Sequence, residues 1–410
     1  GSPPYRSYHI SPRPTTVVRG PRRRPTSGRR LQPSLYIILH DGWSRAVFDA
    51  KMPRTRRFLS GVAKNRPYQF FDFAQLHTQA DARTVQNEVP LFLGRPYDFR
   101  WANRRMLNST CPPEVWSGGT KAMWERLRAE GYRTAYGATH CNGIFGYRRC
   151  PELEQSFHHL APFPHDDAMC AKSLNPDELY PFTFMCKGRR RVFEHYHRYF
   201  EQLWRQHPTA PKFGWFQFNF EHMKMPELNA LYDTRLRGHI RRVLDADPQG
   251  HTVVVVMGDH GPRGACDEAN PGLWLVVGRG LLRQRPSLGL SLRQNRGSLV
   301  SMLDLHATLL GLLGLGPKPL RRSGDISGGV AQASKAGQSS TRCRTGPCDF
   351  GVDVIAENRT CAEARIHPLY CSCAGAWRTL QATKYHKSLG LLLMQYMNSV
   401  LEPAKSACAW

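Results

Sequence analysis

Three short apolar runs along the chain each end on a carboxylate next to a histidine. They are residues 35–39 before His40 and Asp41, residues 215–220 before Glu221 and His222, and residues 253–257 before Asp259 and His260. Apolar runs of this length, bounded by polar turns, are typical of strands buried inside a sheet. Glycines stand on both sides of the last pair, and we expect them to let the backbone turn tightly there.

Helical patterns fill the intervals between these runs. Residues 52–61, 84–94, 191–207, 225–246 and 298–315 have apolar positions or end signals typical of helices. Within residues 123–137 an amphipathic helix, a turn at Gly131 and a strand follow one another. Helices alternating with strands predict an α/β fold, in which helices flank a mostly parallel central sheet.

Composition divides the chain into four parts. Residues 1–32 are a basic, flexible arm, and residues 33–315 hold the α/β domain. Residues 316–346 are rich in Gly, Ser, Arg and Lys and are expected to be a linker. Residues 347–410 are a cysteine-bearing C-terminal extension.

The chain is strongly basic. It has 57 Lys and Arg against 32 Asp and Glu, a formal net charge of +25. Basic arms can bind nucleic acid or anionic membranes. The arginines at positions 13–30 have no aromatic residues among them and the chain has no recognisable nucleic-acid module, so a solvated linker is favoured over nucleic-acid binding. No apolar run is long enough to span a membrane and the start has no signal-peptide pattern. We therefore expect any signal or membrane anchor to lie upstream.

Twelve cysteines occur at irregular spacing and crowd towards the end of the chain. The closest pair, Cys371 and Cys373, does not have the spacing of a zinc ribbon. An even number of cysteines fits disulfides formed in an oxidising compartment. Two glycosylation sequons, at Asn108 and Asn358, agree with a secretory route through the Golgi lumen to the cell surface or the extracellular space.

If the three strands are parallel neighbours, their carboxyl ends meet at one edge of the sheet. Asp41, Asp259 and His260 would then converge, and carboxylates with a neutral imidazole suit Zn²⁺ or Mn²⁺. Each piece has a plainer explanation. Asp-Gly after a strand is commonly a turn, Asp-His can cap a helix, and His222 alone would be a core histidine. His306, on an apolar helix, is expected to be structural.

Five segments together resemble the DUF229 group of sulfatase-like proteins, within the alkaline phosphatase superfamily. They are IILHDGWSRAVFDAKMPRTRRFL, TVQNEVPLFLG, MCKGRRRVFEHYHRYF, VVVVMGDHGPRG and ENRTCAEARIHPLYCSC. With residues 299–314 added, the resemblance spans residues 33–373. It implies an alkaline phosphatase/sulfatase-like catalytic domain over residues 33–315.

Position by position, the resemblance implies four ligands of a divalent metal ion, Zn²⁺, Mn²⁺ or Ca²⁺. They are Asp41, Thr84, Asp259 and His260. Thr84 would also be the nucleophile, at a helix start whose N–H groups help hold an anion. His222 and Arg263 would contact the substrate, an anionic ester. For Arg263 a solvated charge is an equal alternative.

The chain departs from the family pattern at three places. Asp41 is followed by Gly42-Trp43 where the family has Ser, Gln86 replaces a Pro, and the acidic residues after Arg263 are largely absent. Thr84 does not lie in the motif that yields formylglycine in sulfatases, so phosphate is favoured over sulfate. The sequence thus leaves three hypotheses. These are a metal-dependent hydrolase or transferase acting on phosphate esters of glycans or lipids, an inert extracellular binding protein that keeps the fold, and a nucleic-acid binder.

Overall fold

The structure is a computed structural model. It describes residues 32–64, 66–81, 83–97, 121–139, 156–160, 186–187, 189–219, 229–265, 267–316 and 342–371, and isolated positions between 388 and 399. Residues 1–372 form one unit and residues 373–410 a second. Most of the basic arm and of the linker lies outside the described residues, so the predictions made for them stay predictions.

The centre of the first unit is a seven-stranded sheet in the order β2-β10-β9-β1-β8-β4-β5. Its strands are β1 (Ser34–His40), β2 (Tyr68–Phe73), β4 (Arg133–Ala138), β5 (His159–Leu160), β8 (Lys212–Phe218), β9 (Thr252–Gly258) and β10 (Leu273–Gly278). β1 pairs in parallel with β8 and β9, β4 pairs in parallel with β5 and β8, and β10 is antiparallel to both of its neighbours. The predicted mostly parallel α/β sheet is confirmed.

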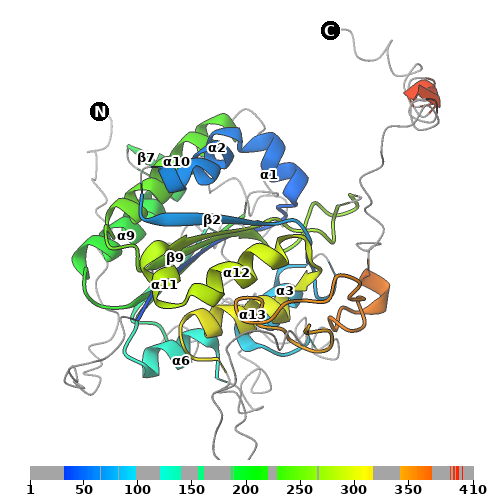
Figure 1. Ribbon diagram of the computed structural model, residues 1–410. Helices are drawn as coiled ribbons and strands as arrows, with labels where there is room; N and C mark the ends of the chain where they lie inside the picture. Colours follow the sequence, from blue (N-terminus) through cyan, green and yellow to red (C-terminus); the bar gives the residue numbers. More distant parts are fainter. Residues whose placement is uncertain are drawn as a thin grey trace, which may run out of the picture. The chain divides into compact units, whose positions relative to one another are not determined.

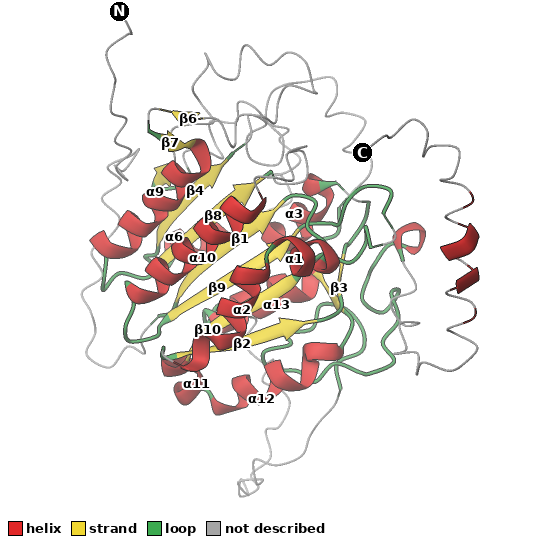
Figure 2. Cartoon of the chain, turned by 90° about the horizontal axis from the view of Figure 1, so that it is seen from above, coloured by secondary structure: helices red, strands yellow, loops and turns green. Residues whose placement is uncertain are grey.

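Helices cover both faces of this sheet (Figures 1 and 2). One face carries α1 (Arg45–Lys51), α2 (Pro53–Gly61), α9 (Val192–Gln206) and α10 (Asn229–Asp245). The other carries α3 (Thr84–Leu93), α6 (Met123–Ala129), α11 (Arg279–Gln284), α12 (Pro286–Gln294) and α13 (Met302–Leu312). The described residues of the first unit also include the short strands β3 (Leu76–His77), β6 (Cys186–Lys187), β7 (Arg190–Arg191) and β11 (Val300–Ser301), and 3₁₀ turns at Val62–Lys64, Asn295–Gly297 and Pro368–Tyr370.

Two hydrophobic clusters explain why the central strands are apolar throughout. Along β1, Leu35, Ile37 and Leu39 enter the cluster beneath α3 and α13. The alternating residues Tyr36 and Ile38 enter the cluster beneath α9 and α10. A strand covered on both sides needs apolar residues at every position, so its sequence shows no polar alternation.

Two predicted boundaries differ from the structure. The strand expected over residues 215–220 is β8, which ends at Phe218, so Glu221 and His222 do not follow it directly. The helix expected from residue 298 begins at Met302, because Ser301 caps it: the Ser301 hydroxyl accepts a hydrogen bond from the N–H of Asp304.

Part of the C-terminal extension packs into the main core. Cys348, Phe350 and Ile355 lie in the cluster that contains α3 and α13. Disulfides join Cys343 to Cys348 and Cys361 to Cys371, as expected for a chain made in an oxidising compartment. Among the described residues no helix has both the length and the hydropathy needed to cross a membrane. In the second unit, the helical side chains Leu391, Leu392, Met394 and Tyr396 are exposed.

Candidate metal centre and nucleophile

The ends of β1 and β9 bring three predicted ligands together. The two strands pair in register up to His40 and Gly258, so the residues that follow emerge side by side. Nε2 of His260 lies 3.2 Å from Oδ1 of Asp41 and 3.5 Å from Oδ2 of Asp259. All three side chains are buried, and one donor atom from each lies within 4.8 Å of the others. The predicted convergence at the carboxyl edge of the sheet is therefore confirmed.

Glycines make this close approach possible. Gly258 and Gly261 flank a bend of the backbone at Asp259 and His260, in line with the expected tight turn, and neither glycine has a positive φ angle. A Cβ atom on Gly258 would lie 2.0 Å from the carbonyl oxygen of Trp43, and one on Gly261 would lie 2.4 Å from that of Asp267. Backbone crowding excludes a side chain at both positions.

Gly42 requires glycine for its backbone conformation. Its φ is 75°, which lies in the left-handed region that favours glycine. In this conformation the N–H of Gly42 donates to Oδ1 of Asp259 at 3.1 Å. The N–H of His260 donates to the same oxygen at 2.9 Å. These bonds fix one oxygen of Asp259 and leave Oδ2 facing His260.

The backbone also orients the imidazole. Nδ1 of His260 lies 2.7 Å from the carbonyl oxygen of Gly261. A carbonyl can only accept, so Nδ1 carries the hydrogen and Nε2 points at the two carboxylates. This tautomer is the one in which neutral imidazole presents Nε2 as a ligand.

Without a cation the cluster holds excess negative charge. Burial raises the pKa of Asp259 to about 6, and the nearby Asp41 adds to this, while His260, Gly42 and Thr84 oppose it. Burial lowers the pKa of His260, but the charges of Asp259 and Asp41 outweigh it and raise that pKa to about 10. A protonated imidazole thus balances the carboxylates in the metal-free state.

The donor set fits a divalent cation. Two carboxylates and an imidazole are a ligand set used for Zn²⁺ and Mn²⁺. Oδ2 of Asp259 and Nε2 of His260 are buried and, apart from the contacts within the cluster, have no hydrogen-bond partner among the described residues. Buried polar atoms normally bind a hydrogen-bond partner, a water molecule or an ion. Asp41, Asp259 and His260 are therefore the residues that would hold a metal ion.

Thr84 is the first residue of α3, as predicted. Its side chain is half-buried and is among the hydrogen-bonding groups that lower the pKa of Asp259. The predicted nucleophile therefore lies beside the predicted ligands. Its position at the first turn places the N–H groups of the helix start close to the same cluster.

A network that the sequence did not reveal fixes the loop before Thr84. Oδ1 of Asn87 accepts from the N–H of Gln79 at 2.8 Å, and its Nδ2 donates to the carbonyl oxygens of Asp81 and Arg83 at 2.9 and 3.1 Å. Oε1 of Gln86 accepts from the N–H of Asp81 at 3.1 Å. Gln86, which replaces the family's Pro, thus has a structural task in this chain.

Trp43 and His40 pack next to Asp41, on the side of the sheet that α9 and α10 cover. The ring of His40 stacks on that of Trp43 with centroids 3.6 Å apart. Nε2 of His40 lies 2.7 Å from the hydroxyl of Tyr232 on α10. In the sequence, this packing was signalled by Gly42-Trp43, which stands where the family has Ser and a variable residue.

Three further predictions have different outcomes. Arg263 lies in the turn after His260 and is exposed, so the structure does not bury it with the three ligands. His222 lies outside the described residues. His306 is structural, as expected: it is buried, its Nδ1 donates to the carbonyl oxygen of Leu91 at 2.8 Å, and its ring fills the space beside Gly94.

Fold and site together define an α/β protein with a buried, metal-competent cluster beside a helix-start threonine. The sequence profile of DUF229, described as "protein of unknown function", matches residues 6–410. The chain belongs to this family, which confirms the resemblance drawn from its motifs.

Solved structures give matches at low sequence identity. The C-terminal periplasmic domain of EcEptC from Escherichia coli, in complex with Zn, is 11% identical, with 70% of this chain and 83% of that chain covered and a TM-score of 0.47. The lipoteichoic acid synthase LtaP from Listeria monocytogenes is 11% identical (70% and 72% covered, TM-score 0.45). A protein in the alkaline phosphatase superfamily from Vibrio parahaemolyticus is 15% identical (72% and 72% covered, TM-score 0.43). No curated protein matches the chain.

Proposed function

We propose that the chain is a metal-dependent hydrolase or transferase of phosphate esters that uses Thr84 as its nucleophile. One observation carries the proposal: the buried cluster of Asp41, Asp259 and His260 lies beside the hydroxyl of Thr84 at the start of α3. A cation-binding cluster and an adjacent hydroxyl are the parts that phosphoryl transfer requires.

Each residue has a defined task. Asp41, Asp259 and His260 hold the divalent ion, with Thr84 as a further ligand. The bound ion lowers the cost of ionising a hydroxyl and neutralises charge on the ester. Attack by Thr84 forms the Oγ1–P bond and breaks the bond to the ester oxygen, which leaves with the hydroxyl proton. Water or an acceptor alcohol then takes the phosphoryl group and restores Thr84.

The start of α3 supplies the anion-binding half of the site. Its first N–H groups have no partner within the helix and carry the positive end of the helix dipole. The phosphate oxygens of an ester bound at Thr84 would accept hydrogen bonds from these N–H groups. Arg263 and His222 would contact the oxygens that point away from the helix. Because the nucleophile is a hydroxyl, phosphate esters are proposed over sulfate esters.

We propose a substrate and a location from the same features. The two disulfides fit an oxidising compartment, so the phosphate ester would belong to a glycan or lipid of the secretory pathway, in the Golgi lumen, at the cell surface or outside the cell. A membrane anchor upstream of the chain is part of this proposal. Nucleic acid is not proposed as a partner.

A panel of phosphomonoesters, phosphodiesters and sulfate esters tests the reaction. Wild-type protein supplied with Zn²⁺, Mn²⁺ or Ca²⁺ should turn over phosphate esters, and Thr84→Ala should lose at least about 100-fold in kcat because no nucleophile remains. Thr84→Ser keeps the hydroxyl and should retain activity. Equal rates for wild type and Thr84→Ala would contradict a threonine nucleophile.

The alternative is an inert binding protein that keeps the fold. The changes at Gly42-Trp43 and Gln86 favour it, because they alter the family pattern next to Asp41 and Thr84. This alternative predicts that the protein holds no stoichiometric metal and that Thr84→Ala changes nothing measurable. Loss of metal from Asp41→Asn would rule it out.

A further inference from the structure

Gln79 joins the Thr84 loop to a segment far along the chain. Its side-chain Nε2 donates to the carbonyl oxygen of Arg365, across a separation of 286 residues. The N–H of His367 donates to the carbonyl oxygen of Gln79 at 3.2 Å. Gln79 is 3% exposed, so on its side both bonds start from a buried residue, although Arg365 itself is exposed.

The same residue also bonds to the helix that Thr84 begins. The N–H of Gln79 donates to Oδ1 of Asn87, and Asn87 in turn holds the carbonyl oxygens of Asp81 and Arg83. Gln79 therefore lies between the C-terminal segment on one side and the last residues before Thr84 on the other.

The segment that forms these hydrogen bonds with Gln79 is closed by a disulfide. Cys361 and Cys371 are bonded to each other, and Arg365 and His367 lie between them. Arg365 has a φ of 58°, the only positive φ among the described residues other than glycine. A left-handed arginine costs free energy and persists only where its surroundings demand it. Here that conformation accompanies a carbonyl turned towards Gln79.

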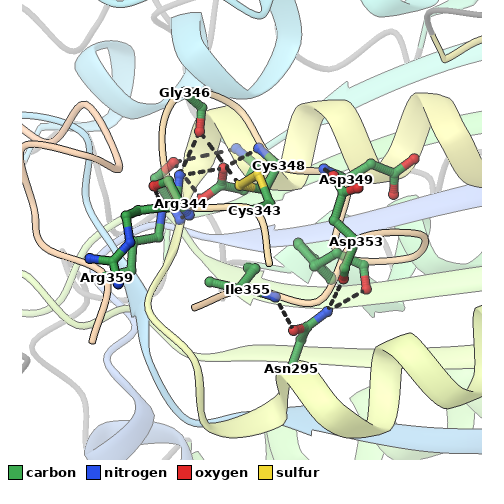
Figure 3. The surroundings of a disulfide bond; sticks show 12 residues. Asn295, Cys343, Arg344, Gly346, Cys348, Asp349, Asp353, Ile355 and Arg359 are labelled. Atoms are coloured by element: carbon green, nitrogen blue, oxygen red, sulfur yellow. Dashed lines mark hydrogen bonds and ion pairs between the residues drawn. A yellow bond between two sulfur atoms is a disulfide. The ribbon is translucent and has the colours of Figure 1, made fainter. Parts of the chain in front are cut away.

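The chain just before this segment is firmly anchored to α13. Nη1 of Arg359 lies 2.6 Å from Oδ2 of Asp304, with both side chains fully buried. The N–H of Cys348 donates to the other oxygen of Asp304 at 2.6 Å. Nη2 of Arg359 also donates to the carbonyl oxygen of Gly346 at 2.6 Å, beside the Cys343–Cys348 disulfide (Figure 3). These contacts hold the chain that leads into Cys361–Cys371 in a fixed position on α13.

We propose that the disulfide-closed segment Cys361–Cys371 is a clamp that sets the position of Thr84, with Gln79 as the positioning residue that connects them. The catalytic part of this inference rests on the proposed function. The clamp itself does not depend on the proposed function, because it is a statement about how rigidly residues 79–87 are held. Releasing the clamp leaves Asp41, Asp259 and His260 in place on β1 and β9.

Two variants of the full chain release the clamp, and a third is their control. Gln79→Met keeps the size of the side chain but removes the donor to Arg365. Cys361→Ser combined with Cys371→Ser opens the disulfide. Gln202→Met makes the same chemical change on α9, whose residues take no part in the clamp, and should behave as wild type.

Hydrogen exchange of amides 79–87 tests the clamp without reference to activity. We expect exchange to rise by about tenfold or more in Gln79→Met, with β1 and β9 unchanged. On a phosphate ester that wild type turns over, kcat should fall by about 10- to 100-fold while KM changes little, because the misplaced nucleophile acts on a substrate that still binds.

The outcomes separate the two claims. Unchanged exchange in Gln79→Met overturns the clamp, whether or not wild type is active. Raised exchange with unchanged kcat overturns the positioning role. If the double cysteine variant does not fold, Gln79→Met decides alone. If wild type is inactive on every ester, the exchange data still decide the clamp, and only the proposed function fails.

Discussion

Nε2 of His260 lies 3.2 Å from Oδ1 of Asp41, and this contact joins the carboxyl ends of two adjacent parallel strands. The pair is buried and lies beside a second carboxylate, Asp259. Protonation of His260 and binding of a divalent cation are therefore two ways of balancing the same negative charge.

Metal affinity should consequently depend on pH. The carboxylates raise the pKa of His260 to about 10, so a cation must displace a proton when it binds at neutral pH. We expect the apparent affinity for Zn²⁺ or Mn²⁺ to rise between pH 6 and pH 8 by up to about tenfold per unit. Calorimetry in buffers of different ionisation enthalpy should show about one proton released. Affinity that is flat across this range would contradict the prediction.

Gly258→Ala should be strongly destabilising. A Cβ atom at this position would lie 2.0 Å from the carbonyl oxygen of Trp43, and the backbone would have to shift. We expect a loss of about 1–3 kcal/mol in the free energy of unfolding. Gly61→Ala is the matched control, because a Cβ atom added there would meet no other atom within 4 Å. It should be neutral or gain up to about 1 kcal/mol in urea denaturation.

Breaking the buried ion pair of Asp304 and Arg359 should loosen the C-terminal segment. Both side chains are 0% exposed, so removing one leaves the other charged and buried. Arg359→Met alone should cost about 3–5 kcal/mol. Asp304→Leu with Arg359→Met should cost less than the sum of the single changes, measured by chemical denaturation. The more exposed pair of Arg66 and Asp245 should contribute under about 1 kcal/mol.

His306 should make the fold sensitive to acid. Burial lowers the pKa of His306 to about 4, with the hydrogen bond to Leu91 opposing this in part. The unfolded chain takes up a proton near pH 6.5, whereas the folded chain does so only near pH 4. Stability is therefore lost as pH falls through this window, by at most about 3 kcal/mol from His306. His306→Gln should flatten the fall in unfolding free energy between pH 6.5 and pH 4. An unchanged slope would show that other groups are responsible.

The strands and the ligand cluster could be predicted because their signals are local. Apolar runs buried on two faces, such as residues 253–257, stand out from polar surroundings. Their parallel order then brings Asp41 and Asp259 to the same edge without further information. Thr84 was predicted from the family motif, and its place at a helix start agrees with that prediction.

Long-range hydrogen bonds could not be predicted in this way. Nothing in the sequence near Gln79 indicates that it bonds to Arg365, or that Asn87 holds the loop before Thr84. The crowding that excludes a side chain at Gly258 and Gly261 was not visible either, because the approach of Trp43 and Asp267 depends on the tertiary fold. Such contacts depend on which surfaces meet after folding.

The metal content of purified protein tests the central claim most directly. After incubation with Zn²⁺, Mn²⁺ or Ca²⁺ and removal of free ions, wild type should retain at least about one ion per chain. Asp259→Asn should retain less than about a tenth of that amount, because its loss removes both a ligand and half of the buried charge. Natively folded wild type that retains no metal, or an Asp259→Asn variant that retains as much as wild type, would contradict the account.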